Sequence, residues 1–274
     1  MRIGIIGTGN MGSILLEAFM DSGAIPQKNM FITNRTLSRA KQFQERYPQI
    51  NVGENAEIIA KECELIFICI KPLDIHPLLM KINPLLNEQQ CVVSITSPIS
   101  VAQLESVLPC SCIRAIPSIT NRSLSGVSLL TFGQYCSSNW ITVIKELLGK
   151  ISKTVDIDED ITRVASDIVS CGPAFFSFLV QKFVQAAVHE TKITEEEATL
   201  LVSEMLIGLG QLLEKNYYTL QTLQKKVCVK GGVTGEGIKV LEEANLDAVF
   251  QKLFQKTHEK YYEDIAKVTE QFQS

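Results

Sequence analysis

The sequence has no excess of positive charge and no uninterrupted apolar run of membrane-spanning length. Its 26 Lys and Arg residues stand against 30 Asp and Glu residues, which gives a net charge of −4, so the overall charge favours no contact with nucleic acid. No apolar run approaches the roughly 18 residues that cross a bilayer. The first expected strand begins just after Met1 and Arg2, so we expect no signal peptide. We therefore expect a cytoplasmic protein that binds neither nucleic acid nor a membrane.

The sequence also lacks the spacings that hold metal ions or mark disulfide frameworks. Only three histidines are present, His76, His189 and His258, and they lie far apart in the chain. The eight cysteines include no Cys-x-x-Cys pair, and several lie in apolar segments. Such thiols are typical of reduced, buried cysteines in a cytosolic protein. We expect no metal site.

Internal repeats are absent as well, and the 274 residues suffice for two domains, given a usual size of about 100–200 residues per domain. Up to residue 156, apolar segments of strand length alternate with amphipathic helical stretches, which predicts a doubly wound parallel sheet of the Rossmann type. Leu65–Ile70 is apolar without alternation, as in a strand buried on both faces. The strands are expected near residues 3–6, 30–33, 52, 65–70, 91–95, 111–115, 126–132 and 153–155.

The most informative segment is Arg2–Gly12, RIGIIGTGNMG. A short apolar run breaks into three spaced glycines, and an amphipathic stretch follows. In a strand–turn–helix unit, Gly7 permits the tight turn, Gly9 allows a backbone to approach a pyrophosphate, and Gly12 allows close helix–strand packing. The N-terminus of the helix then offers N–H groups to the phosphates. We predict a dinucleotide site, with a ligand-free glycine turn as the alternative.

The second expected strand ends in Asn34 and Arg35 instead of the acidic residue that usually binds the ribose 2′-hydroxyl of NAD. A carboxylate would repel a 2′-phosphate, whereas a guanidinium can bind it with two parallel hydrogen bonds. Arg39 follows one helical turn later. The sequence therefore predicts NADP as the cofactor. The alternative is that Arg35 is a solvated turn residue.

Residues 157–274 contain no convincing strand and are expected to form an all-α dimerisation domain, with the NADP-binding domain at residues 1–156. The segment Asp167–Glu190 carries apolar residues around most of a helix circumference, which requires burial on nearly all sides. We expect a homodimer joined through this domain, which could assemble into a higher oligomer of dimers. The charged segment Lys256–Ser274 is expected to be a solvated helix face.

The chain resembles pyrroline-5-carboxylate reductases over nearly its full length. The matching features, in order, are IGIIGTGNMG at residues 3–12, Asn34-Arg35-Thr36, Asn55-Ala56-Glu57, Ile70-Lys71-Pro72, Arg114 with Pro117, Cys171-Gly172-Pro173-Ala174-Phe175 and Gly231-Gly232-Val233-Thr234. The resemblance implies an NADP-binding Rossmann domain, a helical domain that interlocks into a dimer, and reduction of the cyclic imine 1-pyrroline-5-carboxylate to proline, or of a related imino acid.

The resemblance also implies which residues form the site. The cofactor-binding residues would be Gly7, Thr8, Gly9, Asn10, Met11, Gly12, Asn34, Arg35, Asn55, Ile70, Lys71, Pro72 and Thr96. The substrate-binding residues would be Gly231, Gly232, Val233, Ser118 and Ser170. Thr234 would be the catalytic residue, whose hydroxyl orients the ring nitrogen and relays a proton. The alternative for the glycine segment is a plain turn between helices with Thr234 as N-cap.

Three segments depart from the pattern of the family, all of them near its substrate. They are Ile116–Asn121, Val169–Phe175 and Val229–Thr234. This drift resembles a divergent branch of the family that occurs in late-competence operons, so a non-catalytic NADP-binding paralogue is the first alternative function. The second is a β-hydroxyacid dehydrogenase. Those enzymes pair a catalytic Lys with a nearby Asn in the long central helix, but here Lys182 has no Asn beside it.

Overall fold

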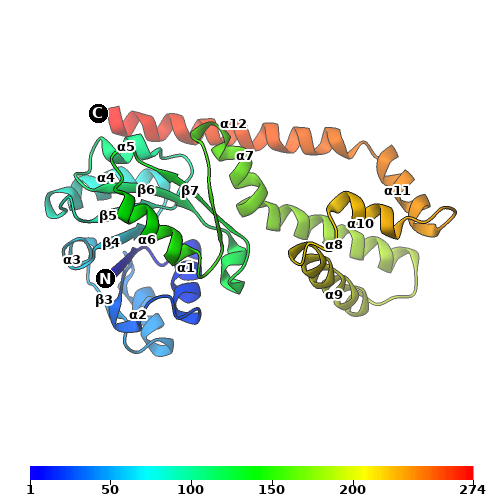
Figure 1. Cartoon of the computed structure of the whole chain (residues 1–274), viewed down its shortest axis with the longest axis horizontal. Coiled ribbons are helices and arrows are strands. Elements are labelled where there is room, and N and C mark those ends of the chain that lie inside the picture. The colour runs from blue at the N-terminus through cyan, green and yellow to red at the C-terminus, as the bar shows by residue number, and fades with distance from the viewer. Residues whose placement is uncertain (274) are drawn as a thin grey trace. The chain divides into compact units, whose positions relative to one another are not determined.

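A computed structural model describes residues 1–273 of the chain. Two compact units are present. The first comprises Met1–Pro173 together with the segment from Lys256 onward, and the second comprises Ala174–Gln255. Figure 1 shows the elements in chain order. Each unit is described by itself.

The first unit contains an eight-stranded sheet in the order β3-β2-β1-β4-β5-β6-β7-β8. Neighbouring strands from β3 to β6 are parallel, and β1 lies between β2 and β4. The strand order therefore reverses at β1, where doubly wound sheets bind their ligands. The strands are β1 (Ile3–Ile6), β2 (Met30–Thr33), β3 (Asn51–Val52), β4 (Leu65–Ile68), β5 (Cys91–Ser94), β6 (Ser111–Ile116), β7 (Val127–Phe132) and β8 (Lys153–Asp156).

The sheet departs from the expected parallel arrangement at β7, which runs antiparallel to β6. The connection between Ile116 and Val127 holds only a short 3-10 turn, Ile119–Ser123. A parallel crossover needs a dozen or more residues and usually a helix, so this short connection reverses the chain. β8 follows helix α6 (Ser138–Leu148) and runs parallel to β7. The Rossmann-type fold is confirmed, with two reversed strands at one edge.

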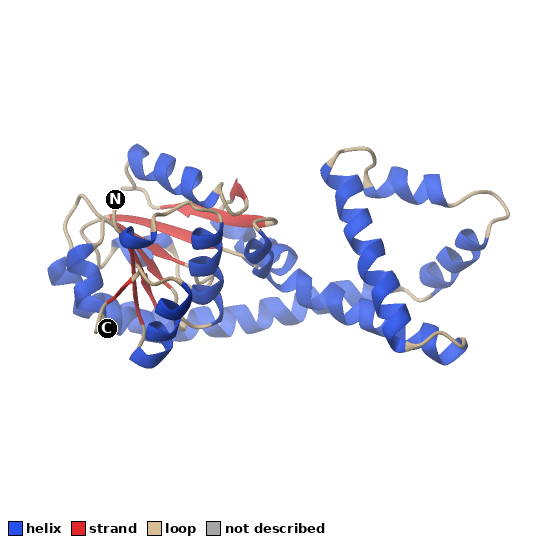
Figure 2. Cartoon of the chain, turned by 90° about the horizontal axis from the view of Figure 1, so that it is seen from below, coloured by secondary structure: helices blue, strands red, loops and turns tan. Residues whose placement is uncertain are grey.

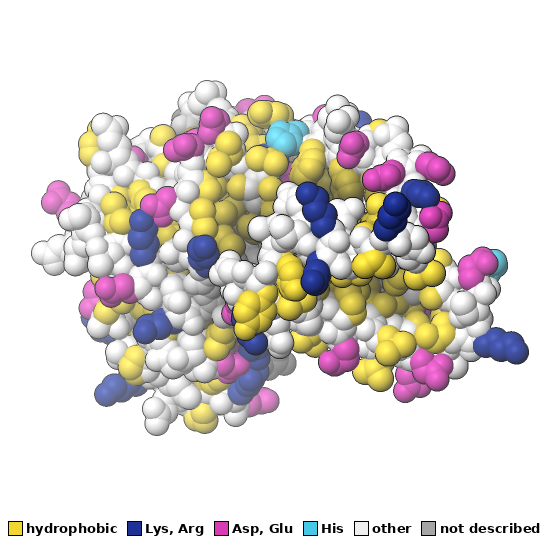
Figure 3. All heavy atoms as spheres, turned by 45° about the vertical axis from the view of Figure 1, so that its right-hand side comes forward, with side chains coloured by type: hydrophobic (Ala, Val, Ile, Leu, Met, Phe, Trp, Pro, Cys, Tyr) yellow, Lys and Arg dark blue, Asp and Glu magenta, His cyan; other side chains and the backbone are white. Residues whose placement is uncertain are grey.

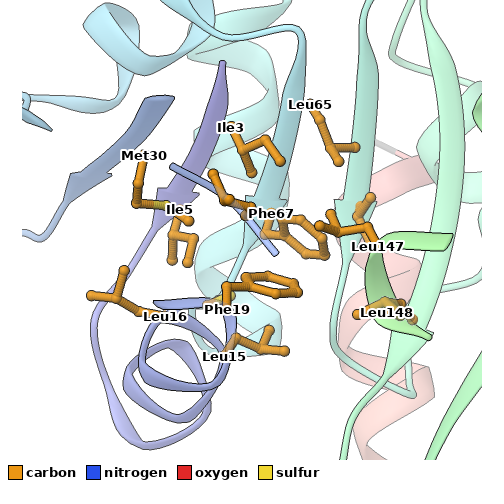
Figure 4. Packing of buried hydrophobic residues seen from close by; sticks show 14 of the residues in the cluster. Ile3, Ile5, Leu15, Leu16, Phe19, Met30, Leu65, Phe67, Leu147 and Leu148 are labelled. Carbon is orange, nitrogen blue, oxygen red and sulfur yellow. The ribbon is translucent and has the colours of Figure 1, made fainter. Parts of the chain in front are cut away.

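Helices cover both faces of the sheet (Figure 2), and β4 shows why its sequence is continuously apolar. Leu65 and Phe67 belong to one buried cluster, whereas Ile66 and Ile68 belong to another. The Phe67 ring lies 5.6 Å from the ring of Phe19, centroid to centroid (Figure 4). The helices of this region are α1 (Asn10–Asp21), α2 (Leu37–Arg46), α3 (Ala56–Glu62), α4 (Pro72–Ile82) and α5 (Val101–Glu105).

Past β8, the described residues form helices and turns but no strand, as expected. Thr194 and Glu197 form a reciprocal capping box at the start of α9. The expected helix Asp167–Glu190 begins with a π-helical turn, Asp167–Cys171. The helices are α7 (Thr162–Ser166), α8 (Gly172–Glu190), α9 (Glu195–Glu214), α10 (Leu220–Val227), α11 (Val233–Glu243) and α12 (Leu246–Gln273).

The last part of α12 is not the solvated face that its charge suggested. Val268 is fully buried in the core cluster that contains Ile66 and Leu79. Apolar side chains recur at Tyr261, Val268 and Phe272, a helical spacing that the many charged neighbours obscured. The segment from Lys256 onward therefore belongs to the first compact unit, and the units divide after Pro173 and again at Lys256. The sequence had indicated a single boundary between residues 156 and 157.

Candidate cofactor and substrate site

The glycine turn between β1 and α1 has the geometry that its sequence suggested. Gly7 has φ +100°, which side-chain-bearing residues rarely adopt. A Cβ on Gly12 would collide with the carbonyl oxygen of Gly7, so Gly12 permits the close approach of helix and turn. A Cβ on Gly9, in contrast, would meet no protein atom within 4 Å. Packing within the protein therefore does not require glycine at position 9. Close approach of a pyrophosphate to the protein backbone at this position would require it.

The residues around this turn fit a bound pyrophosphate. α1 has no acidic residue in its first turn, and its N-cap Gly9 provides no side-chain cap, so its N–H groups remain available. Thr8 is buried, and its Oγ1 has no hydrogen-bond partner among the described residues. Asn10 is exposed beside the turn, and Met11 is half-buried. A ligand phosphate at this position would supply the acceptor that the Thr8 hydroxyl lacks.

Asn34 joins the glycine turn to the end of β2. Its Oδ1 accepts a hydrogen bond from the Thr8 N–H at 3.3 Å, and its Nδ2 donates to the Thr36 carbonyl at 3.0 Å. The side chain thus shapes both loops. Arg35 and Arg39 are exposed next to it, and among residues 1–273 neither guanidinium has an ion-pair partner. Both cations are free to bind a phosphate.

The other residues assigned to the cofactor lie after neighbouring strands. Ile70 and Lys71 follow β4, with Pro72 at the first position of α4, and Thr96 follows β5. The carboxyl ends of adjacent parallel strands meet at one edge of the sheet, which brings these loops together. Asn55 has a structural task, because its Oδ1 accepts a hydrogen bond from the Ile58 N–H at 3.1 Å and caps α3.

Ser118 and Ser170 lie on two segments that hydrogen-bond to each other. The Ser118 hydroxyl donates to the Val169 carbonyl at 2.6 Å, and the Ser170 hydroxyl donates to the Pro117 carbonyl at 2.9 Å. Ser118 is 1 % exposed and also caps the 3-10 turn that follows it. The structure therefore brings these two sequence-assigned residues together, with both hydroxyl protons engaged in protein contacts.

A buried arginine near the same edge was not assigned a role from the sequence. Arg114 in β6 is 1 % exposed and donates to Thr162 Oγ1 at 2.6 Å and to Thr131 Oγ1 at 3.1 Å. Glu159 lies 3.5 Å from its guanidinium. Burial lowers the pKa of Arg114, and the Glu159 carboxylate opposes that shift. A lone cation inside an apolar strand was the sequence signal for this network.

The glycine segment of the helical unit is a turn that leads into α11. Gly231 has φ +75°, and Gly232 is the N-cap of α11 without a side-chain cap. Val233 is exposed at the first position of the helix, and Thr234 is half-buried at the second. Thr234 is therefore not the N-cap that the alternative interpretation required. The N–H groups of this turn and the Thr234 hydroxyl belong to one short segment.

Cysteine chemistry finds no support at the site. Cys171 ends the π-helical turn, and burial raises the pKa of its thiol, while the Arg163 guanidinium 3.4 Å away acts in the opposite direction. All eight cysteines are free thiols, and five of them are buried. No group of three His, Cys, Asp or Glu side chains among residues 1–273 could hold a metal ion.

The helical unit leaves large apolar side chains uncovered in the single chain. On α8, Phe176, Phe178 and Phe183 are 63 %, 56 % and 65 % exposed. Leu200 and Leu201 on α9 are exposed to a similar degree. Apolar side chains gather among charged ones on the face seen in Figure 3. Helices of this kind need a partner surface.

One continuous helical run, Glu159–Glu190, also has the length and composition of a membrane span. Polar residues interrupt this run, so the sequence contains no uninterrupted apolar segment of that length and none was expected. Buried helices of soluble proteins meet the same criterion of length and apolarity, so this observation is weak evidence for a membrane.

Two family models match the chain. One, described as pyrroline-5-carboxylate reductase dimerisation, covers residues 159–264. The other, described as NADP oxidoreductase coenzyme F420-dependent, covers residues 2–98. The exposed apolar helices therefore lie in a segment that matches a dimerisation domain, and the glycine turn lies in one that matches an NADP-binding fold.

Whole-chain comparisons agree with these matches. ComE operon protein 4 of Bacillus subtilis is 55% identical over 99% of both chains. Pyrroline-5-carboxylate reductase 3 of the same organism is 30% identical over 95% of both chains. The crystal structure of Plasmodium falciparum pyrroline carboxylate reductase with NADP bound has a TM-score of 0.84 at 20% identity, covering 96% of this chain and 97% of that one. The chain therefore belongs to the pyrroline-5-carboxylate reductase family of NADP-dependent oxidoreductases.

Proposed function

We propose that the chain reduces a cyclic imine with NADPH, either 1-pyrroline-5-carboxylate to proline or a related imino acid. The observation that carries this proposal is the turn before α11, where Gly231, Gly232 and Thr234 of the family pattern are retained in one short segment. A reductase of the same family is 30% identical along nearly the whole chain. The proposal therefore rests on a retained substrate segment within a shared fold.

The cofactor would extend across the carboxyl edge of the sheet. The turn Gly7–Gly12 would hold the pyrophosphate, and Arg35 with Arg39 would bind the 2′-phosphate. The nicotinamide would lie over the loops after β4 and β5, next to Lys71 and Thr96. When bound, the cofactor supplies the hydride, and the protein supplies position and electrostatics.

The substrate carboxylate would accept hydrogen bonds from N–H groups of Gly231, Gly232 and Val233, with additional stabilisation from the positive end of the α11 dipole. The Thr234 hydroxyl would orient the ring nitrogen and relay a proton to it. A hydroxyl of ordinary high pKa relays a proton better than it donates one outright. Ser170 would offer its lone pairs to the substrate, because its proton is engaged by the Pro117 carbonyl. Ser118 would line the site, since its hydroxyl donates to the Val169 carbonyl and accepts from the Thr120 N–H and hydroxyl.

The protein would act as a cytoplasmic homodimer, and such dimers could assemble into a higher oligomer. The exposed aromatic side chains of α8, such as Phe176 and Phe183, would be covered by the second copy. Residues 1–156 would then serve as the NADP-binding domain and residues 157–274 as the dimerisation and substrate domain.

One alternative has an observation in its favour. The 55% identity to ComE operon protein 4 exceeds the identity to the reductase by a wide margin, and the three segments near the substrate have drifted. A non-catalytic NADP-binding protein with a competence-related role would explain both. In that case the cofactor would stabilise the fold or report on the redox state, without turnover.

Steady-state oxidation of NADPH in the presence of 1-pyrroline-5-carboxylate distinguishes the two functions. The reductase proposal expects substrate-dependent loss of NADPH absorbance and formation of proline. Binding of NADPH is measured first on the same preparation by fluorescence. Protein that binds NADPH and yet shows no turnover with this imine or with its six-membered homologue would overturn the proposal and favour the non-catalytic function.

A further inference from the structure

The carbonyl oxygen of Ser97 accepts two hydrogen bonds from opposite parts of the first unit. The Tyr261 hydroxyl of α12 donates to it at 3.1 Å, and the Arg114 guanidinium of β6 donates at 3.3 Å. A carbonyl oxygen has two lone pairs, so these two donors satisfy it completely. Ser97 directly follows Thr96 in the loop after β5. The peptide at this point of the cofactor edge is therefore held from two sides.

Tyr261 is itself held by a chain of polar contacts. The Arg163 guanidinium lies over its ring, 5.5 Å from the centroid, and donates to Asp167 Oδ1 at 2.7 Å. Asp167 is buried and accepts a second hydrogen bond at 2.6 Å from Thr257, one turn before Tyr261 on α12. Burial raises the pKa of Tyr261, so its hydroxyl stays protonated and remains a donor at neutral pH.

The end of the same helix also contacts the first turns of α4, which follow the loop after β4. Gln271 Nε2 donates to the Leu73 carbonyl at 3.1 Å, two residues after Lys71. The Phe272 ring meets the His76 ring edge to face, with 4.7 Å between centroids. α12 thus contacts the loop that follows β5 and the start of α4, directly after the loop that follows β4. The nicotinamide is proposed to lie over these two loops.

We propose that Tyr261 is a positioning residue for the nicotinamide half of NADP, acting through the Ser97 carbonyl and the loop after β5. The hydroxyl does not touch the cofactor in this arrangement. It fixes one peptide of the loop against which the nicotinamide half packs, so less conformational freedom is lost on binding. The adenosine half would bind at the switch point beside β1 and β2, near Arg35, so the proposal expects no effect of this loop on it. The inference rests on the proposed position of the nicotinamide and is independent of imine reduction.

The test compares Tyr261→Phe with Tyr262→Phe. The second substitution is a matched control, because Tyr262 is the next residue of α12 and is 63 % exposed. Two ligands are titrated into each variant: NADPH, which spans the whole site, and adenosine 2′,5′-bisphosphate, which occupies only the adenosine half. We expect Tyr261→Phe to weaken NADPH binding about fivefold, the effect of one neutral hydrogen bond. Binding of the bisphosphate should stay unchanged, and the control should bind both ligands normally.

Hydrogen–deuterium exchange provides a second measurement that needs no ligand. In Tyr261→Phe, the peptide that spans residues 95–101 should exchange faster than in the wild type and in Tyr262→Phe. Unchanged NADPH affinity in Tyr261→Phe would overturn the proposal. Equal weakening of both ligands would also overturn it, because a general loosening of the unit would then be the cause. Neither outcome depends on turnover, so failure here is distinguishable from failure of the reductase proposal.

Discussion

The Ser118 hydroxyl donates a hydrogen bond to the Val169 carbonyl oxygen, with 2.6 Å between the two oxygen atoms. This contact joins the loop after β6 to the π-helical turn Asp167–Cys171. π-Helical turns occur frequently at functional sites. Here a serine from another segment donates a hydrogen bond to a carbonyl group of the turn. The resemblance assigned Ser118 to the substrate, whereas its geometry first explains the attachment of two segments.

Ser118→Ala should therefore reduce stability. The change leaves the Val169 carbonyl without this donor and removes the cap of the 3-10 turn, so we expect the free energy of unfolding to fall by about 1–2 kcal/mol. Urea denaturation followed by circular dichroism measures it. Ser123→Ala is the control, since the exposed Ser123 hydroxyl bonds only within the same turn, to the Thr120 carbonyl. An equal fall in the free energy of unfolding in both variants would contradict the role of Ser118 in attaching the two segments.

Arg35→Asp should reverse the cofactor preference. The exposed Arg35 guanidinium has no ion-pair partner within residues 1–273, so its loss should cost the protein no internal contact. NADPH binding should weaken by about 1–3 kcal/mol, the scale of a charge-assisted hydrogen bond, and NADH binding should not weaken. Lys41→Asp on the exposed side of α2 makes the same change of charge at another site. Equal affinity of the wild type for both cofactors would refute the prediction.

Thr234→Ala should lower the turnover of the proposed imine substrate on the order of 10²-fold, the low end for a positioned proton-transfer group. NADPH affinity should not change, because Thr234 belongs to the second compact unit and the glycine turn to the first. Thr234→Ser keeps the hydroxyl and should retain most of the activity. Steady-state kinetics with paired NADPH titrations test this. Turnover that is the same in the alanine variant and the wild type would exclude Thr234 as the catalytic residue.

Phe183→Glu should disrupt the assembly. Phe183 on α8 is 65 % exposed in the single chain, and a carboxylate there would be buried without a partner in an apolar dimer contact. Sedimentation velocity at micromolar concentration should show a dimer for the wild type and a smaller species or aggregate for the variant. Tyr135→Glu, at a 76 % exposed aromatic of the first unit, should leave the dimer intact. A folded wild-type monomer would refute the prediction.

Stability should fall at alkaline pH because of Tyr47. Burial raises the pKa of Tyr47 to about 12, and its hydrogen bond to Asp21 acts in the same direction. Since the folded state holds this proton more tightly than the unfolded state, its contribution is complete below pH 10 and is lost between about pH 10 and 12. Tyr47→Phe should lack this loss. The difference in unfolding free energy between the two proteins should therefore shrink across that range, and a constant difference would contradict the assignment.

Local patterns predicted much of the fold. The glycine turn, the unbroken apolar run of β4 and the capping box at Thr194 each depend on neighbours within a few residues, and all three appear in the structure as expected. The reversed direction of β7 could not be predicted in this way, because alternation and burial are the same in either direction. Only the shortness of the preceding connection carried that information.

The candidate site was less accessible to sequence reasoning. Ser118 and Val169 lie 51 residues apart, and no local pattern links them. Arg114 is a lone charge in an apolar strand, yet its partners come from β7 and α7. The contact of Tyr261 with Ser97 spans 164 residues. Such pairs are set by topology, so a single sequence supplies the candidates without their partners.

The division of α12 bears on how the chain is made. Residues 174–255 form a unit that is inserted into the other, whose final helical segment begins at Lys256 and brings Val268 into the core. On a ribosome, which releases the N-terminal end first, the sheet would be translated long before that segment emerges. The inserted helices, with their uncovered aromatic side chains, would meanwhile be complete. A nascent chain would thus expose these apolar helices before the core of the first unit is closed, and formation of the proposed dimer could begin while the cofactor edge is still unfinished.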